Sequence, residues 1–187
     1  MYEPDFDRDR FEGQMNPSER AVLYDTVMRL KPRYVWEVGT CRGGGSTYYI
    51  STALENLDNG GKLITSEVNQ EWYEYAMNLY GLGQPLEHLR QRVMFNFGDA
   101  CTIYPKMLKE FPVHMVFIDG GEDSIQCLHQ AMMFRPFMAV GTVIAFHDWD
   151  NGKTDYVRGA MENDKDWKLV CSDIAYRAFQ RVGDLHK

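Results

Sequence analysis

The chain has 187 residues, of which 44% are hydrophobic and 25% are charged, a composition typical of one globular domain and not of a disordered or fibrous protein. Its 27 acidic residues outnumber its 20 basic ones, and the net charge of −7 would repel nucleic acid and anionic membranes. No apolar run reaches the roughly 18 residues needed to span a bilayer, and the first residues lack a signal-peptide pattern. We therefore expect a cytoplasmic protein with neither nucleic acid nor membrane as a partner.

The first 15 residues differ from the rest, because they are rich in acidic side chains and poor in apolar ones. We expect residues 16–187 to form a single domain and residues 1–15 to form an arm. The arm is either a frayed end or a mobile segment that closes over a ligand, for which Phe6, Phe11 and Met15 would be apolar anchors.

Helical and extended patterns alternate along the rest of the chain. The first helix should begin at Asn16-Pro17, since asparagine caps helices and proline suits their first position. Short runs rich in β-branched and aromatic residues predict strands at 33–38, 62–67, 93–97, 114–118 and 142–146. This order predicts an α/β fold with helices on both faces of a parallel sheet. Residues 167–171 and 176–180 are too close together for a parallel crossover, so they should form an antiparallel hairpin.

The strongest functional signal is the run from Glu37 to Ser46, which follows the first strand, precedes a helix and contains four glycines. Glycines let the backbone approach a ligand at a helix amino terminus, where free N–H groups favour a carboxylate or phosphate. Gly39 and Gly43 are separated by three residues, whereas the first two glycines of the dinucleotide fingerprint are separated by one. The run therefore favours a ligand site other than one for a nicotinamide cofactor.

Two further strand ends carry acidic residues. Glu67 ends the second predicted strand, where a carboxylate can accept hydrogen bonds from a ribose diol or can cap the next helix. Gly98-Asp99-Ala100 follows the third strand, where Asp99 and nearby backbone groups could contact a purine or could cap a helix. The residues alone leave both alternatives open.

The motifs Glu37-x-Gly39-x-x-x-Gly43, Glu67, Gly98-Asp99-Ala100 and Phe117-Ile118-Asp119-Gly120 together resemble the class I S-adenosylmethionine-dependent methyltransferases. They are most similar to small O-methyltransferases of the catechol O-methyltransferase type and to the macrocin O-methyltransferase and cephalosporin hydroxylase-like group. The resemblance implies a doubly wound, Rossmann-like sheet of seven strands, mostly parallel, with a reversed last strand. It also implies S-adenosylmethionine as cofactor. The cofactor-binding residues would then be Met15, Glu37, Gly39, Thr40, Gly43, Ser46, Glu67, Gly98, Asp99, Ala100 and Asp119.

A metal site is also expected at the ends of the fourth and fifth strands. Asp119 ends the fourth strand and His147-Asp148 follow the fifth, so these side chains should meet at the carboxyl edge of the sheet. Carboxylates suit Mg²⁺, and the resemblance implies that the matching residues bind such an ion; a histidine ligand suits Mn²⁺, Fe²⁺ or Zn²⁺ better. We expect a divalent cation, Mg²⁺ or Mn²⁺, at Asp119, His147 and Asp148. Helix capping by the aspartates and an indirect, hydrogen-bonding role for His147 are the alternatives.

Glu122 stands where the catechol-type enzymes have a lysine and the macrocin-like group usually has a histidine. It could accept a proton, bind the metal or be a solvated residue at the start of a helix. We expect an enzyme that methylates a hydroxyl of a small molecule, with Glu122, Asp119 and Asp148 as catalytic residues, and a homo-oligomer is compatible with the small chain. The alternatives are a catalytically silent nucleoside- or nucleotide-binding regulatory protein and, less favoured by the glycine spacing, a nicotinamide oxidoreductase.

Overall fold

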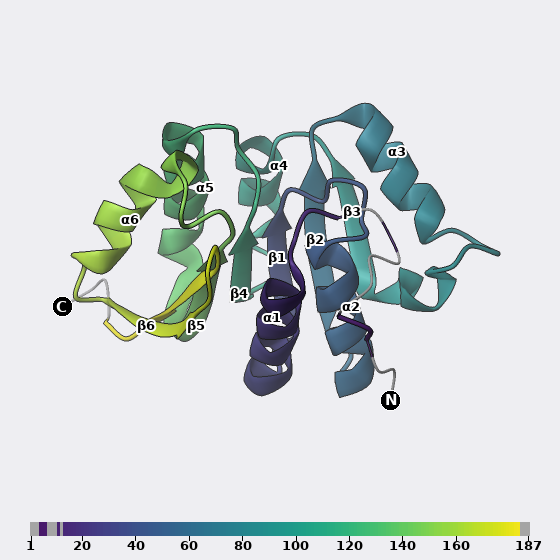
Figure 1. Ribbon diagram of the computed structural model, residues 1–187, viewed down its shortest axis with the longest axis horizontal. Helices are drawn as coiled ribbons and strands as arrows, with labels where there is room; N and C mark the ends of the chain where they lie inside the picture. Colours follow the sequence, from purple (N-terminus) through teal and green to yellow (C-terminus); the bar gives the residue numbers. More distant parts are fainter. Residues whose placement is uncertain (1–3, 7–10, 12, 184–187) are drawn as a thin grey trace.

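A computed structural model describes residues 4–6, 11 and 13–183 of the chain (Figure 1). Its strands are β1 (Tyr34–Val38), β2 (Lys62–Glu67), β3 (Val93–Phe97), β4 (Val113–Ile118), β5 (Met138–Phe146), β6 (Trp167–Ser172) and β7 (Arg177–Arg181). Its α-helices are α1 (Pro17–Leu30), α2 (Ser46–Leu57), α3 (Gln70–Leu79), α4 (Ala100–Met107), α5 (Ser124–Phe134) and α6 (Asp155–Glu162). Short 3₁₀ helices are η1 (Glu87–Arg92), η2 (Arg135–Phe137) and η3 (Gly152–Thr154).

The strands form one seven-stranded sheet in the order β3-β2-β1-β4-β5-β7-β6. Strands β1 to β5 pair in parallel, whereas β7 runs antiparallel to both β5 and β6. The predicted doubly wound sheet with a terminal hairpin is therefore confirmed. The strand order reverses between β1 and β4, and ligands of open α/β sheets bind at the carboxyl ends of the strands beside such a reversal.

Helices cover both faces of the sheet because its central strands are apolar on both sides. On one face, α1 and α2 contribute Leu23 and Ile50 to an apolar cluster that also contains Leu63 of β2. On the other face, α4, α5 and α6 pack against a second cluster that includes Trp36 and Phe146. Figure 1 shows these two sets of helices on opposite sides of the strands. None of the helices in the described ranges is long and apolar enough to cross a membrane.

Helix α1 begins where the sequence predicts it. The Asn16 side chain accepts a hydrogen bond from the backbone N–H of Glu19, and the Glu19 carboxylate accepts one from the backbone N–H of Asn16. This reciprocal pair satisfies two N–H groups that a helix end otherwise leaves without partners. It also fixes the Glu19 carboxylate at the upper end of α1, close to the carboxyl edge of the sheet.

Strand β5 is longer than predicted, because it begins at Met138 and not at residue 142. Residues 139–141 are exposed, and Gly141 has a positive φ of 94°. The pairing with β4 changes register between Val113 and Met115. An exposed, irregular strand start has no alternating apolar pattern, so the sequence gives little sign of it.

The described part of the arm packs on the α1–α2 face. The Phe6 ring lies 5.6 Å from the Tyr49 ring, and the Phe11 ring lies 5.4 Å from the Tyr48 ring. Met15 is 2% exposed and belongs to the same apolar cluster. Residues 1–3, 7–10 and 12, on which the expectation of a mobile arm also rests, lie outside the described residues, and that expectation stays a prediction.

Candidate functional site

A cavity of about 310 Å³ lies at the carboxyl ends of β1, β2 and β4, where the strand order reverses. The structure places six of the residues predicted from the sequence around it: Gly39, Glu67, Asp99, Ala100, Asp119 and Glu122. Other residues that line it include Gln14, Trp72, Gln130 and Lys153. The separate motifs of the sequence therefore meet in one place.

The loop after β1 is held against the ends of β2 and β4. Gly39 has a positive φ of 95°, and a Cβ there would lie 2.9 Å from the backbone nitrogen of Gly120. The backbone N–H groups of Gly39 and Thr40 both donate to the Ser66 carbonyl. Only glycine fits this conformation and this close approach without strain, so the first glycine of the motif has a structural reason.

The Glu67 carboxylate connects β2 to the glycine loop. One oxygen accepts a hydrogen bond of 2.7 Å from the backbone N–H of Cys41, and the other accepts one of 2.9 Å from that of Asn69. The side chain of Asn69 caps α3, so capping is not the role of Glu67. Each carboxylate oxygen has a second lone pair, and Glu67 can still accept hydrogen bonds from a ligand in the cavity.

Glu37 lies beneath the loop with its carboxyl group fully buried. One oxygen accepts hydrogen bonds of 2.7 Å from the hydroxyls of Thr47 and Thr65, and the other has no partner within the described residues. Burial raises the pKa of Glu37 to about 7, against the nearby hydroxyls of Ser46, Thr65 and Thr47, which favour the charged form. A buried acceptor without a donor is a place where a ligand's N–H group, or a water, would be stabilised.

The remaining predicted cofactor residues have different positions. Met15, Thr40 and Ser46 line a narrow hollow that also includes Gly39 and Asp119, which both line the main cavity as well. Asp99 caps α4 by accepting a hydrogen bond from the backbone N–H of Cys101, and it lines the cavity as well.

Two of the predicted glycines have local reasons for their positions. Gly43 lies against α3, where a Cβ would meet that of Ala76 at 3.0 Å, and Gly98 has a positive φ of 127° at the turn after β3. Contact of Gly43 and Gly98 with a cofactor stays a prediction.

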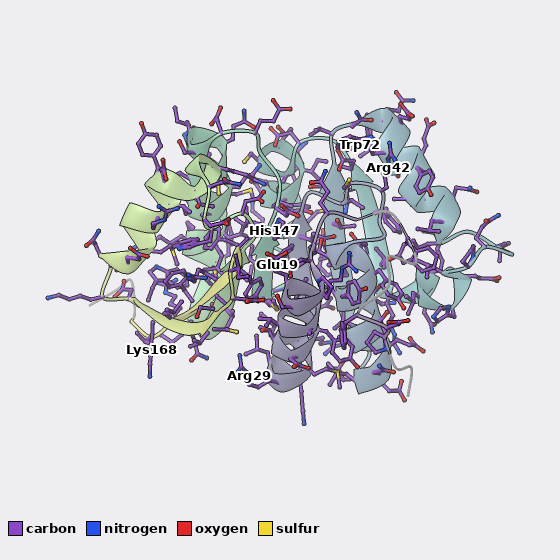
Figure 2. All side chains as sticks on the ribbon, in the orientation of Figure 1. Glu19, Arg29, Arg42, Trp72, His147 and Lys168 are labelled. Carbon is purple, nitrogen blue, oxygen red and sulfur yellow. The ribbon has the colours of Figure 1, made fainter. Side chains whose placement is uncertain are left out.

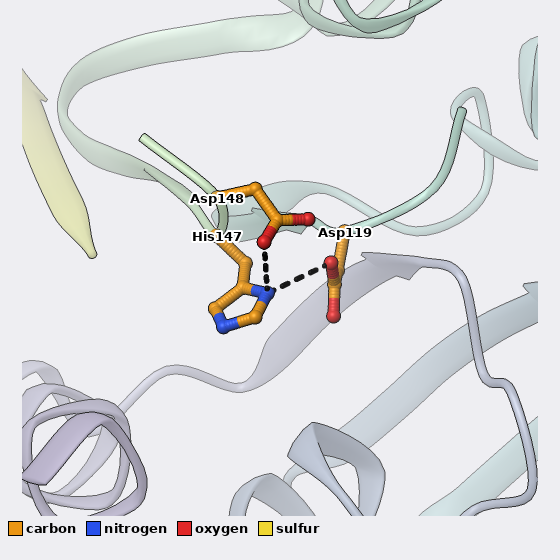
Figure 3. Close-up of side chains that lie close together, drawn as sticks. All are labelled: Asp119, His147 and Asp148. Carbon is orange, nitrogen blue, oxygen red and sulfur yellow. Dashed lines mark hydrogen bonds and ion pairs between the residues drawn. The ribbon is translucent and has the colours of Figure 1, made fainter. Parts of the chain in front are cut away.

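Asp119, His147 and Asp148 come together as the sequence predicts (Figure 3). Nδ1 of His147 lies 3.1 Å from an Asp119 carboxylate oxygen and 3.5 Å from one of Asp148. Neither aspartate caps a helix, because Asp123 caps α5 and Asn151 caps η3. The capping alternative for Asp119 and Asp148 is therefore wrong.

The other ring nitrogen of His147 reaches Glu19, which the sequence does not indicate. Nε2 of His147 lies 3.1 Å from the Glu19 carboxylate, and both side chains are buried. Figure 2 shows the two residues one above the other at the end of α1. Burial alone would lower the pKa of His147, but hydrogen bonding and the charge of Asp119, the charge of Asp148 and the Glu19 bond raise it to about 9. His147 thus has a carboxylate partner on each side of its ring.

Lys153 is the main site residue that the sequence does not reveal. Its ammonium lies 2.8 Å from an Asp148 carboxylate oxygen, 3.2 Å from one of Asp119 and 3.1 Å from the Asp119 carbonyl oxygen. Burial alone would lower the pKa of Lys153, yet the two carboxylates outweigh it and the net shift is upward. Lysines are usually solvated, and no motif marks this one.

These contacts bear on whether the predicted metal ligands fit a divalent cation. A divalent cation binds carboxylates whose charge no other cation offsets, and an imidazole nitrogen with a free lone pair. Here the carboxylates of Asp119 and Asp148 are already paired with Lys153, and both nitrogens of His147 face carboxylates. The set as arranged does not fit a resident divalent cation.

Comparison with known proteins identifies the family. Residues 36–149, more than half of the chain, match a family model described as a methyltransferase domain. The chain therefore belongs to this methyltransferase family, as its resemblance implied. No protein among those with curated functions matches the sequence.

Several solved structures share the fold. TomG of Streptomyces achromogenes, an O-methyltransferase of tomaymycin synthesis, superposes with a TM-score of 0.75 at 16% identity over 91% of this chain and 82% of TomG. An O-methyltransferase of Bacillus cereus gives 0.73 at 17% identity over 90% and 83%. A methyltransferase of Podospora anserina gives 0.68 at 12% identity over 91% and 80%. At these identities the likeness establishes the class I methyltransferase fold.

Proposed function

We propose that the protein is an S-adenosylmethionine-dependent methyltransferase that methylates a hydroxyl of a small, uncharged molecule. The observation that carries the proposal is the cavity at the reversal of strand order, with the Gly39 loop on one side and Glu67 on another. The methyltransferase family supports it, and so do the similar structures of TomG and the Bacillus cereus enzyme, which hold S-adenosylmethionine and S-adenosylhomocysteine.

The residues around the cavity fit this cofactor. Glu67, in the cavity wall, has a carboxylate that suits the two ribose hydroxyls. Glu37 does not line the cavity but lies beneath the adjoining loop, and its buried oxygen without a partner suits the cofactor's ammonium. A Cβ at Gly39 would meet the backbone of Gly120, so glycine lets the loop lie against the end of β4 at the edge of the cavity. Ala100 and Trp72 add apolar surface for the adenine.

The chemistry asks little of the protein besides alignment. When bound, the cofactor supplies an activated methyl group: the acceptor oxygen forms the new bond to carbon while the bond to sulfur breaks and its electron pair remains on sulfur. The hydroxyl proton must pass to a base, for which we propose the carboxylate of Glu122 in the cavity wall. The acidic cavity lining of Glu67, Asp99, Asp119 and Glu122 opposes an anionic acceptor.

Calorimetric titration tests the proposed cofactor. S-adenosylhomocysteine should bind with one site per chain, whereas NAD should give no measurable heat of binding. A release assay for S-adenosylhomocysteine with a panel of small alcohols and phenols would then identify the acceptor class. Preference for NAD would reject the proposal, and tight binding without turnover across the panel would favour a silent binding protein. Turnover in the presence and absence of a chelator tests the predicted Mg²⁺ or Mn²⁺.

A further inference from the structure

We take the side of the cavity formed by Asp119 and Lys153 as the acceptor side. It contains a positive charge that belongs to the chain itself, the ammonium of Lys153. The Lys153 ammonium has three oxygen acceptors within 3.2 Å, namely one carboxylate oxygen each of Asp119 and Asp148 and the Asp119 carbonyl. The Lys153 side chain is 14% exposed, and the residue lines the cavity. This ammonium therefore lies between the two carboxylates that would have to hold a divalent cation.

The backbone around Lys153 is built to hold it there. Asp148 has a positive φ of 57°, and the following turn returns the chain so that the Lys153 backbone N–H donates to the side chain of Asn151 at 2.8 Å. Thr154, which is fully buried, donates through its hydroxyl to the Trp149 carbonyl at 3.1 Å. Hydrogen bonds on both sides of Lys153 make this a fixed position and not that of a free surface lysine.

His147 fits this arrangement better than it fits a metal site. A carboxylate oxygen lies 3.1 Å from each of its ring nitrogens, one from Asp119 and one from Glu19. Both ring nitrogens are therefore occupied by carboxylate partners from the chain itself, so neither is left free for a metal ion.

We propose that the Lys153 ammonium takes the place of a divalent cation between Asp119 and Asp148, and that methyl transfer in this chain uses it as the positive charge of the acceptor site. The idea rests on the proposed function for the reaction, but the arrangement of the charges can be tested without turnover. Lys153 neutralises the two carboxylates from within the chain and repels any second cation. The acceptor oxygen would then meet an ammonium and not a metal ion.

Binding of Mn²⁺, followed by electron paramagnetic resonance, tests this arrangement directly. Wild-type protein should bind Mn²⁺ weakly, whereas Lys153→Ala frees the two carboxylates and should bind one Mn²⁺ per chain at least about tenfold more tightly. Lys153→Ala combined with Asp148→Ala should lose that gain. Lys168→Ala is the matched control, because Lys168 is exposed on β6, away from the site (Figure 2), and it should behave as wild type.

Two readings of the same samples separate the possible failures. Binding of S-adenosylhomocysteine and the thermal unfolding midpoint show whether each variant is folded, and Lys153→Met, which keeps the length of the side chain, replaces Lys153→Ala if that variant unfolds. Tight binding of one Mn²⁺ by wild type, or no gain in the lysine variants, would overturn the proposal. Failure of wild type to bind S-adenosylhomocysteine would instead reject the proposed function. The Mn²⁺ measurements would still decide whether Lys153 takes the place of a divalent cation.

Discussion

The carboxylates on the two sides of the cavity have different kinds of partners. On the side where we propose the cofactor, here called the cofactor half, Glu37 beneath the loop and Glu67 in the cavity wall accept hydrogen bonds from threonine hydroxyls and backbone N–H groups, which are neutral donors. On the side where we propose the acceptor, here called the acceptor half, Asp119 and Asp148 are paired with the Lys153 ammonium and the His147 ring. Both halves contain acidic residues, but only in the acceptor half does a cationic side chain of the protein, Lys153, offset their charge.

This difference indicates what each half is prepared to bind. The hydrogen-bond partners of Glu37 and Glu67 are neutral, so these carboxyl groups remain available to a cationic ligand, which suits a cofactor that carries a sulfonium and an ammonium. Carboxylates that are already paired offer little further attraction to a cation, and their positions are fixed before a substrate arrives. This supports the proposal that the acceptor is an uncharged molecule, and each of the following experiments tests one side of this contrast.

The largest effect should come from Gly39, where the two halves touch. Gly39→Ala combines an unfavourable positive φ with a Cβ 2.9 Å from the Gly120 nitrogen, and should lower the free energy of unfolding by about 2–4 kcal/mol. Gly60→Ala is the matched control, because Gly60 has a φ of +74° but nothing within 4 Å of its Cβ position, and it should cost only about 1 kcal/mol. Urea unfolding measures both values. Equal losses of stability would show that the close approach of Gly39 to Gly120 adds nothing to the cost of the positive φ.

The next effect concerns the charge of Glu37. Because burial raises the pKa of Glu37 to about 7 from an ordinary value of 4.5, the folded state binds its proton more tightly than the unfolded state. Its contribution to stability is therefore fully present below pH 4.5 and is lost as the pH rises through about 7, by up to about 3 kcal/mol.

Unfolding of Glu37→Gln as a function of pH checks this contribution. The variant should lack the fall in stability over that range, whereas Glu71→Gln, a change at an exposed site, should keep it. Affinity of wild type for S-adenosylhomocysteine should rise over the same range, as the carboxylate forms. A flat wild-type profile would contradict the buried-acid interpretation.

A smaller effect is expected at Glu67. Glu67→Ala removes the acceptor for the two ribose hydroxyls and the anchor of the Cys41 N–H, so S-adenosylhomocysteine should bind at least about tenfold more weakly. Glu67→Gln keeps one acceptor oxygen, so its affinity for S-adenosylhomocysteine should lie between those of wild type and Glu67→Ala. Glu71→Ala, on the exposed side of α3, is the control. Calorimetry that finds no change in Glu67→Ala would remove this residue from the cofactor site.

The meeting of Gly39 and Glu67 at one cavity could be predicted from the sequence because the information is local. The glycine loop and Glu67 each follow a strand, and parallel strands bring their carboxyl ends to one edge whatever the details of packing. The terminal hairpin was equally accessible, since a short connection permits only antiparallel pairing. Asp119, His147 and Asp148 followed by the same logic, and they do come together.

The partners of that cluster could not be predicted, because they depend on tertiary contacts. The capping pattern at Asn16 places Glu19 in the first turn of α1, but nothing local indicates that the same carboxylate also meets His147, 128 residues away. Lys153 follows Asp148 by five residues. Asp148 has a left-handed backbone conformation, and the turn after it brings the Lys153 side chain back to Asp119 and Asp148. Metal-ligand residue types were therefore recognised, while the lysine that pairs with them was not.

The smallest effect should come from removing residues 1–12 of the arm, because the arm residues that line the cavity and the hollow beside it, Gln14 and Met15, stay in place. Phe6 and Phe11 pack on tyrosines of the α1–α2 face, while Gly13 lies so close to the loop that a Cβ there would be 2.5 Å from the Cα of Gly45. Removing residues 1–12 deletes both aromatic anchors but leaves residues 13–15 in place, so the chain should still fold and bind S-adenosylhomocysteine about two- to fivefold more weakly. Calorimetry measures that loss, and amide hydrogen exchange of residues 3–15 in the full-length chain should slow when S-adenosylhomocysteine is added. Exchange that is equal with and without the ligand would show that the arm is a frayed end, and the cofactor half would then be complete without it.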